Sequence, residues 1–313
     1  MGYPAKYSAS MQGESIMMAV FIEELRRHGK SPTTLRSYQD SWARFARWYE
    51  KEHPAPTPTG GSALPQMATQ LDVANFKRFA AQNFKPNTVA LTLTHLNVIF
   101  RWLVDNGHVP DQPVEKIDRF TVPQSSPKWL NRNEQNALVR AVRQHGNIRE
   151  LAMVTLMLHT GVRVQELCDI RLKDISLSDR KGTMVIPNGK HSKYREIPLN
   201  VDCRRILQRY LETRKTSSNH LFYSQRSGKM SPRGVSFLIA KYAKLTGIDH
   251  LTCHTLRHSF GHELAVRKIP LDVIARLMGH MKKDGSPNLA MTSRYTMPGE
   301  EDLVRAVEEL SWI

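Results

Sequence analysis

Residues 254–260 read His-Thr-Leu-Arg-His-Ser-Phe, and this stretch is the most informative one in the chain. We expect it to be helical, so that His254 and Arg257, three positions apart, project from one face. The pair combines a group that can hold or move a proton with a permanently charged fork that suits a phosphate. Such pairs are common on protein surfaces. This one indicates a functional site only if other residues that suit a phosphate accompany it.

A second phosphate-suited group lies upstream, at Arg163. Its neighbours in the stretch 159–167 are mostly apolar, which places this arginine at the edge of a core. A guanidinium without water needs a partner, and Glu166 stands three residues on. A purely structural ion pair between the two is the alternative interpretation.

The third basic element is the turn of a predicted β-hairpin. Lys190 lies in the turn, with Lys193 and Arg195 behind it. A solvated basic turn is the alternative interpretation. The Gly189-Lys190 pair lacks the glycine and the hydroxyl residue of a phosphate-binding P-loop, so we expect no ATP-driven chemistry.

Two residues near the C-terminal end complete the set of candidates. His280 follows Gly279, which is typical of a helix end. Tyr295 stands in polar sequence, so we expect it to be presented at the surface rather than buried. Together these groups indicate a site that breaks a phosphodiester.

Metal binding is the competing hypothesis for the histidines. His254, His258 and His262 have helical spacing, but Thr255 stands where a zinc-protease helix needs Glu. We therefore predict no metal ion and no cofactor, and we expect His258 to pack or bond locally.

The charge distribution points to a polyanionic partner. The chain has 313 residues and a net charge of +16. Residues 1–127 hold 14 basic and 11 acidic residues, a net of +3, whereas 128–313 hold 31 and 18, a net of +13. Such a surplus in one half favours nucleic acid, with a basic enzyme lacking that partner as the alternative.

Cysteines and apolar runs suggest the compartment. Three scattered cysteines, too few for a disulfide framework or a thiolate zinc site, fit a reducing, cytoplasmic setting. The early apolar run 16–22 is too short to cross a bilayer, so we expect no membrane element.

The hydrophobic pattern predicts a mainly α protein with two domains. We expect an N-terminal tail over 1–13, a helical bundle over 14–107, a proline-rich linker over 108–127, and a mostly α domain with a small β-hairpin over 128–313. The expected helices of the bundle lie near 14–30, 31–50, 71–82 and 86–106. Those of the second domain lie near 132–145, 148–159, 164–172, 201–215, 231–245, 252–266, 270–279 and 301–310, with strands at 183–186 and 194–199.

The ordered set Arg163, Lys190, His254-x-x-Arg257, His280 and Tyr295 resembles the tyrosine recombinases of the phage-integrase family, which include the Xer and Cre types. The local sequences Thr-Gly-Val-Arg, Leu-Met-Gly-His and Arg-Tyr-Thr agree with it. The match is good over 130–310. Residues 14–107 resemble the SAM-like core-binding domain of that family in outline.

The resemblance implies a role for each residue. Tyr295 would attack a DNA phosphate and form a 3′-phosphotyrosyl bond, and His254 would take or hold its proton. Arg163 and Arg257 would bind the non-bridging oxygens. The remaining implied roles are protonation of the leaving oxygen by Lys190, a bond from His280 to the scissile phosphate, DNA contacts from Lys193 and Arg195, and support from Glu166.

The resemblance also implies partners. We expect a two-domain clamp on double-stranded DNA with an inverted-repeat core site, without an arm-binding domain, assembling as a homo-tetramer across a synapse. An accessory protein or partner recombinase is possible in this family, which serves mobile elements and chromosomes alike. The alternatives are a telomere-resolvase-like strand-transfer enzyme, a DNA-binding relative without catalysis, and a metal-dependent nuclease.

Overall fold

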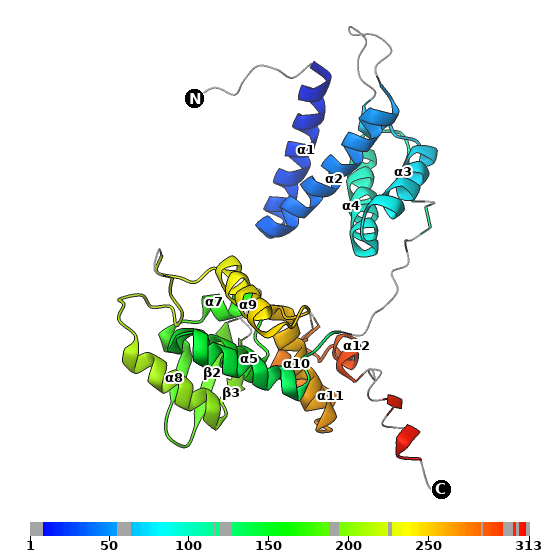
Figure 1. Ribbon diagram of the computed structural model, residues 1–313. Coiled ribbons are helices and arrows are strands. Elements are labelled where there is room, and N and C mark those ends of the chain that lie inside the picture. Colours follow the sequence, from blue (N-terminus) through cyan, green and yellow to red (C-terminus); the bar gives the residue numbers. More distant parts are fainter. Residues whose placement is uncertain are drawn as a thin grey trace. The chain divides into compact units, whose positions relative to one another are not determined.

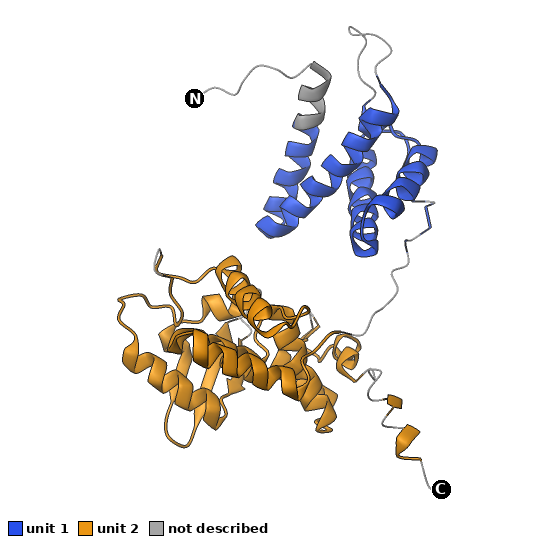
Figure 2. Cartoon of the chain, viewed as in Figure 1, with its two compact units in different colours: residues 1–124 blue, residues 125–313 orange. Residues whose placement is uncertain are grey.

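The computed structural model describes residues 9–54, 64–115, 117–118, 120, 127–187, 194–224, 227–282, 284–296, 303–304 and 307–310, with side chains from residue 16 onward. The chain forms two compact units, residues 1–124 and 125–313, which are coloured separately in Figure 2. The expected fold class, mainly α with a small antiparallel sheet, is confirmed.

The first unit is a bundle of helices around an aromatic core. Ser31 begins the second helix by accepting a hydrogen bond from the Thr34 amide at 3.2 Å, and Thr69 and Asp72 form a capping box at the third. Phe45 and Phe76 pack edge to face in the core, with ring centroids 5.1 Å apart. The helices are α1 (Ala9–Arg27), α2 (Pro32–Glu52), α3 (Gln70–Asn83) and α4 (Pro86–Asp105), with a short 3-10 turn η1 (Pro65–Met67).

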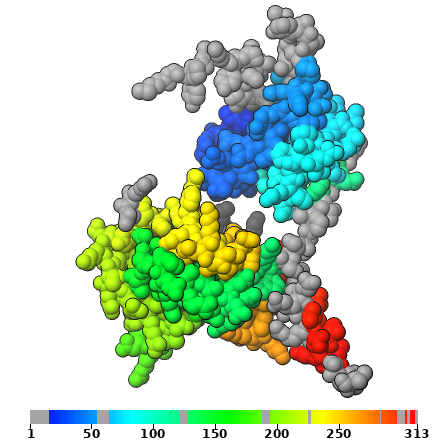
Figure 3. Space-filling model, in the orientation of Figure 1, coloured from blue at the N-terminus to red at the C-terminus, as the bar shows by residue number. Residues whose placement is uncertain are grey.

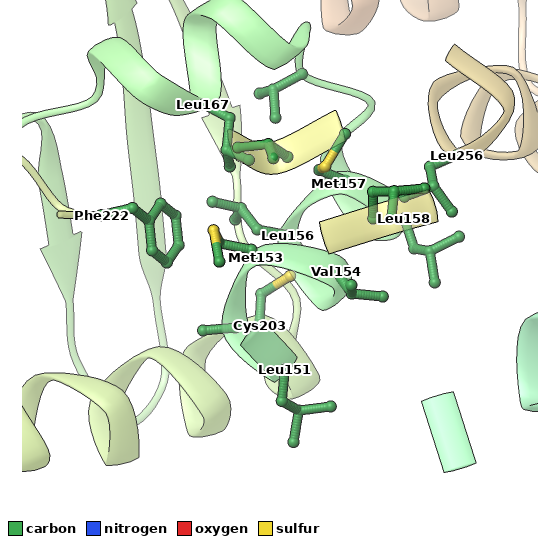
Figure 4. Close-up of a cluster of buried hydrophobic side chains, with 14 of the residues drawn as sticks. Leu151, Met153, Val154, Leu156, Met157, Leu158, Leu167, Cys203, Phe222 and Leu256 are labelled. Carbon is green, nitrogen blue, oxygen red and sulfur yellow. The ribbon is translucent and has the colours of Figure 1, made fainter. Parts of the chain in front are cut away.

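The second unit surrounds α6 (Ile148–Thr160), whose side chains are buried on nearly all faces. Figure 4 shows the cluster that forms around this helix, to which Phe222 and Leu256 contribute from later segments. Helices α5 (Arg132–His145) and α9 (Pro232–Thr246) lie side by side in Figures 1 and 3, and α5 also packs against α6. The remaining helices are α7 (Val164–Asp169), α8 (Val201–Thr213), α10 (Cys253–Val266), α11 (Leu271–Met278) and α12 (Leu289–Thr292), with 3-10 turns η2 (Leu172–Asp174) and η3 (Ser293–Tyr295).

A three-stranded antiparallel sheet lies in the same unit, in the order β1 (Ile175–Leu177), β2 (Gly182–Pro187) and β3 (Tyr194–Pro198). Met184 of β2 pairs with Ile175 on one side and with Ile197 on the other. We predicted β2 and β3 but missed β1, because three residues carry too little alternation to be recognised. The turn between β2 and β3, residues 188–193, lies outside the described residues.

The segment that follows α11 was also incompletely predicted. Residues 281–282 and 284–288 form a tight turn in which Lys282 N donates to Ser286 O at 2.8 Å and Asn288 N donates to His280 O at 2.7 Å. The turn leads into α12 and η3, two short elements that the sequence pattern did not indicate. Of the expected helix at 301–310, the structure describes residues 303–304 and 307–310, and 303–304 and 307–308 are helical.

None of the helices in the described part of the chain is long and apolar enough to cross a bilayer.

Candidate active site

Arg257 lies at the centre of the site and is almost completely buried, with 5% of its surface exposed. Its Nη1 donates to the carbonyl of Gly161 at the end of α6, and its Nη2 donates to the carbonyl of Met278 at the end of α11, at 2.6 Å. Burial, followed by the nearby charge of Arg163, lowers the pKa of Arg257 to about 10, so the guanidinium stays charged at neutral pH. Two helix ends therefore hold one cation in a fixed orientation.

Arg163 is held beside it by the same helix end. Its Nη2 donates to the carbonyl of Gly279 at 3.2 Å, one residue beyond the carbonyl that Arg257 uses. Gly279 ends α11 with φ of +65°, a conformation that favours glycine, and a Cβ there would lie 2.6 Å from Arg195 Nη1. The turn after α11 thus fixes both arginines, which the sequence placed almost a hundred residues apart.

Glu166 joins this cluster from α7. Its carboxylate accepts from Arg163 Nη1 at 2.8 Å and from the Arg163 amide at 2.7 Å, which is the predicted Arg–Glu pair. It also accepts two bonds from Arg195, at 2.9 and 2.7 Å. Burial alone would raise the pKa of this carboxyl, but the bonds and charges of the two arginines lower it to about 2.

Arg195, which we expected at a DNA phosphate, uses its guanidinium inside the unit. Nη1 and Nη2 bond to Glu166, and Nε donates to the carbonyl of Leu277 at 3.1 Å. Its side chain is 13% exposed. The arginine therefore joins β3 to α7 and α11.

His280 connects the arginine cluster to α12. Its Nε2 lies 2.9 Å from Arg257 Nη2, and its Nδ1 lies 3.2 Å from Thr292 Oγ1. Because arginine can only donate, Nε2 is an acceptor and the ring proton is on Nδ1. Burial and the charges of Arg257, Arg163 and Arg195 lower the pKa of His280 to about 3, which agrees with a neutral ring.

Tyr295 is buried in the same site, with 5% of its surface exposed. The expectation that this residue is presented at the surface was wrong. Its ring stacks on His280, with centroids 5.8 Å apart and planes 7° apart. The sequence did not indicate this contact, because the residues flanking Tyr295 are polar. Tyr295 also lies in the short turn η3, which has no periodic apolar pattern, rather than in a long helix.

The hydroxyl of Tyr295 faces α10. His258 Nδ1 lies 3.3 Å from the hydroxyl oxygen, and Arg257 is a second polar neighbour. Burial raises the pKa of the hydroxyl, while the charges of Arg257, Arg294 and Arg163 act in the opposite direction. His258 was not among the predicted site residues, although its position four residues after His254 on the same helix face was a usable signal.

His254 lies on the exposed side of this cluster, in the first turn of α10. Its ring centroid is 6.4 Å from that of His258. Thr252 begins the helix by accepting from the Thr255 amide at 3.0 Å. His254 therefore sits at a helix N-terminus, a place that favours an anion.

The structure brings six of the predicted residues together, with His254 at the edge, namely Arg163, Glu166, Arg195, Arg257, His280 and Tyr295. Lys190 and Lys193 lie outside the described residues. Within the described part of the chain, no group of three His, Cys, Asp or Glu residues has the geometry of a metal site.

The chain is similar to known proteins over most of its length. Residues 128–301 match the family described as the phage integrase family, and residues 17–107 match the phage integrase N-terminal SAM-like domain. Tyrosine recombinase XerA of Pyrococcus horikoshii is 29% identical over 307 residues, which cover 96% of both chains. Tyrosine recombinase XerD of Pseudomonas putida is 30% identical over 294 residues, which cover 90% of this chain and 91% of the relative.

Solved structures share the fold. A XerH recombinase bound to a palindromic difH substrate superposes with a TM-score of 0.74, at 17% identity over 96% of this chain and 85% of that one. A lambda integrase dimer bound to a core site gives 0.70, at 17% identity over 99% and 84%. Because the catalytic family model spans more than half of the chain and encloses the whole arginine–histidine–tyrosine cluster, the protein belongs to the phage integrase family and is a tyrosine recombinase.

Proposed function

We propose that this protein cuts and rejoins DNA strands at a specific site through a 3′-phosphotyrosyl intermediate, without a metal ion or ATP. One observation carries the proposal: Tyr295 lies against His280, which accepts a hydrogen bond from the buried Arg257, all within one chain. Attack on a phosphodiester needs a nucleophile, two fixed cations and neutral imidazoles.

The roles follow from the contacts. Arg163 and Arg257 carry charges that a pentacoordinate phosphate requires, and their carbonyl partners fix their orientation before DNA binds. Tyr295 is the nucleophile, and a neighbouring histidine takes or holds its proton; the family resemblance assigns this role to His254, at the exposed edge. His280 is assigned to the scissile phosphate; its Nε2 accepts from Arg257 in the free protein, so a bond to a phosphate oxygen requires Nε2 to leave Arg257 and to carry a proton.

The basic hairpin supplies the remaining roles. We assign Lys190 to protonation of the leaving 5′-oxygen and Lys193 to a phosphate contact. The bonds of Arg195 to Glu166 and Leu277 favour a positioning role for this arginine, in which it holds the carboxylate that in turn orients Arg163. A direct phosphate contact by Arg195 would require breaking those bonds.

The substrate is double-stranded DNA with inverted half-sites, one per protomer, and two such complexes form a tetrameric synapse. The lambda integrase dimer on its core site and XerH on a palindromic substrate support this arrangement. The apolar side chains Leu303, Val307 and Leu310 are 56%, 68% and 71% exposed in the single chain, which supports docking of this C-terminal segment on a neighbour.

Covalent trapping tests the proposal. Wild type and Tyr295→Phe are incubated in EDTA with nicked suicide duplexes that carry candidate sites from the DNA flanking the gene, and denaturing gels are run. We expect a protein–DNA band in wild type that is lost in Tyr295→Phe. Tyr194→Phe is the matched control, because Tyr194 is 71% exposed and should retain the band.

Each other result contradicts a stated part of the proposal. A band that persists in Tyr295→Phe identifies another nucleophile. Binding without any band indicates a DNA-binding relative without catalysis. Activity that requires a divalent cation indicates a nuclease.

A further inference from the structure

The hydroxyl of Tyr295 has two polar neighbours with different abilities. Arg257 is a donor, since a guanidinium has no acceptor atom. His258 Nδ1, at 3.3 Å, can accept. We assign the ring proton of neutral His258 to Nε2, so that Nδ1 accepts the phenolic hydrogen while Arg257 faces the oxygen. This arrangement gives the hydrogen of the nucleophile a defined acceptor before any substrate is bound.

One face of α10 builds this contact. Gly261 lies three residues after His258, and a Cβ on it would come 2.8 Å from Tyr295 Cδ1. The Tyr295 ring therefore packs into the space that a side chain at position 261 would occupy. This space lies about one helical turn from His258, which contacts the tyrosine hydroxyl. The ring centroids of His258 and Tyr295 are 5.5 Å apart. His254 lies one turn further, toward the exposed end.

The charge state of His258 agrees with an acceptor role. Burial, and then the charges of His254, Arg294 and Arg257, lower the pKa of His258 to about 4, so the ring is neutral at pH 7. Among the described residues, Tyr295 and His280 are further titratable neighbours of this ring. A bound phosphate brings negative charge beside the arginines, which raises the proton affinity of the ring when the reaction starts.

We propose that His258, rather than His254, is the group that takes the phenolic proton of Tyr295 during strand cleavage. The Tyr295 oxygen forms a bond to the scissile phosphorus as the bond from phosphorus to the 5′-oxygen breaks. The phenolic proton moves to His258 Nδ1, and the 5′-oxygen receives a different proton from the group assigned to the leaving side. In rejoining, His258 returns its proton to the tyrosine. This inference rests on the phosphotyrosyl chemistry proposed above.

The test is single-turnover cleavage of the suicide duplex in EDTA by wild type, His258→Ala and His258→Gln. Gln can accept the hydrogen bond but cannot keep the proton, so it separates positioning from transfer. We expect both variants to bind DNA as wild type does and to cleave about 100-fold more slowly or worse, in the range for loss of a general base. His250→Ala is the matched control, since this half-buried histidine bonds the Trp129 carbonyl at 3.2 Å instead.

A second arm replaces Tyr295 with 3,5-difluorotyrosine, whose hydroxyl loses its proton more easily. The ratio of wild-type to His258→Ala cleavage rates should shrink with the fluorinated nucleophile, because less help from a base is needed. An unchanged ratio would show that His258 acts only on position. Wild-type rates in both His258 variants would overturn the assignment, whereas absence of any covalent complex from wild type would instead overturn the proposed chemistry itself.

Discussion

Arg257 Nη2 lies 2.9 Å from His280 Nε2, and this bond joins a residue of α10 to the turn that follows α11. The same nitrogen donates to the Met278 carbonyl, so the guanidinium is shared between a helix end and an imidazole. Both partners are buried. The cation is therefore oriented before substrate arrives, which is the condition under which electrostatic stabilisation is most effective.

The first prediction concerns Arg257→Lys. A lysine keeps the charge but presents it as a single point, so it cannot meet Gly161, Met278 and His280 in one plane. We expect cleavage of the suicide duplex to fall by about 10²- to 10³-fold, the usual loss for a removed oxyanion donor. Single-turnover kinetics measure it, with gel-shift assays of DNA binding alongside.

The matched control for that substitution is Arg149→Lys. Arg149 also donates to a backbone carbonyl, that of Tyr223 at 2.8 Å, but takes no part in the site. Its replacement should leave the cleavage rate unchanged. If both substitutions slow cleavage equally, the effect of Arg257→Lys comes from general loss of stability.

Thr292→Val tests how His280 is held. Thr292 Oγ1 accepts from His280 Nδ1 at 3.2 Å and donates to the Asn288 carbonyl at 2.9 Å, in a fully buried position. Valine has the same shape but leaves His280 Nδ1 without its partner, whereas the Asn288 carbonyl keeps its bond from the Thr292 amide. The unpaired imidazole N–H should cost about 1–3 kcal/mol. Urea denaturation should show this loss, together with slower cleavage. Thr94→Val, at an exposed helical threonine, should change neither, and equal losses in both would contradict the assignment.

Much of the scaffold could be predicted from the sequence because its signals are local. The apolar pattern of α2 and the proline after Ser31, for instance, act within a few residues and define the helix start. β1 is three residues long and acquires its register only by pairing with β2, so local sequence does not specify it. The same is true of η3, whose burial depends on packing against α10.

The site was predictable in composition but not in geometry. Motif order identified Arg163, Arg257, His280 and Tyr295, because each belongs to a short recognisable stretch. The contact between His258 and Tyr295 joins residues 37 positions apart and depends on the space left at Gly261. Such a contact is a property of packing, which single-sequence patterns do not contain.

Gly261→Ala tests whether the Tyr295 ring needs the space beside Gly261. An added Cβ would lie 2.8 Å from Tyr295 Cδ1 and 2.9 Å from Met278 Sδ, so the ring has to move. We expect a stability loss of about 1–3 kcal/mol, typical of overpacking, and a larger loss of covalent trapping than of DNA binding. Gly228→Ala is the control, because its nearest neighbour would be 3.6 Å away. Wild-type levels of covalent trapping by Gly261→Ala would show that the Tyr295 ring does not occupy the space beside Gly261 when it reacts.

The C-terminal segment is tested by replacing Leu303, Val307 and Leu310 together with serine. These side chains are exposed in the single chain, so the change should not alter its folding. If they dock on a neighbouring protomer, the variant should form covalent complexes on one duplex but fail to hold two duplexes together. Analytical ultracentrifugation with DNA separates these species. A variant that assembles as wild type does would remove this segment from the interface.

The acid sensitivity of the site is set by Glu166. Arg195 and Arg163 lower the pKa of this carboxyl from 4.5 to about 2 in the folded protein, so its contribution to stability is fully present above pH 4.5 and is lost as the pH falls toward 2. The contribution is on the order of 3 kcal/mol.

Glu166→Gln resembles the protonated side chain. The difference in unfolding free energy between wild type and this variant should therefore be largest from pH 5 to 7 and should shrink below pH 4.5. Urea denaturation across this range measures it. Glu23→Gln, which removes an exposed ion pair on α1, should give a small difference at every pH, and a pH-independent difference for Glu166→Gln would contradict the assigned ion pairs.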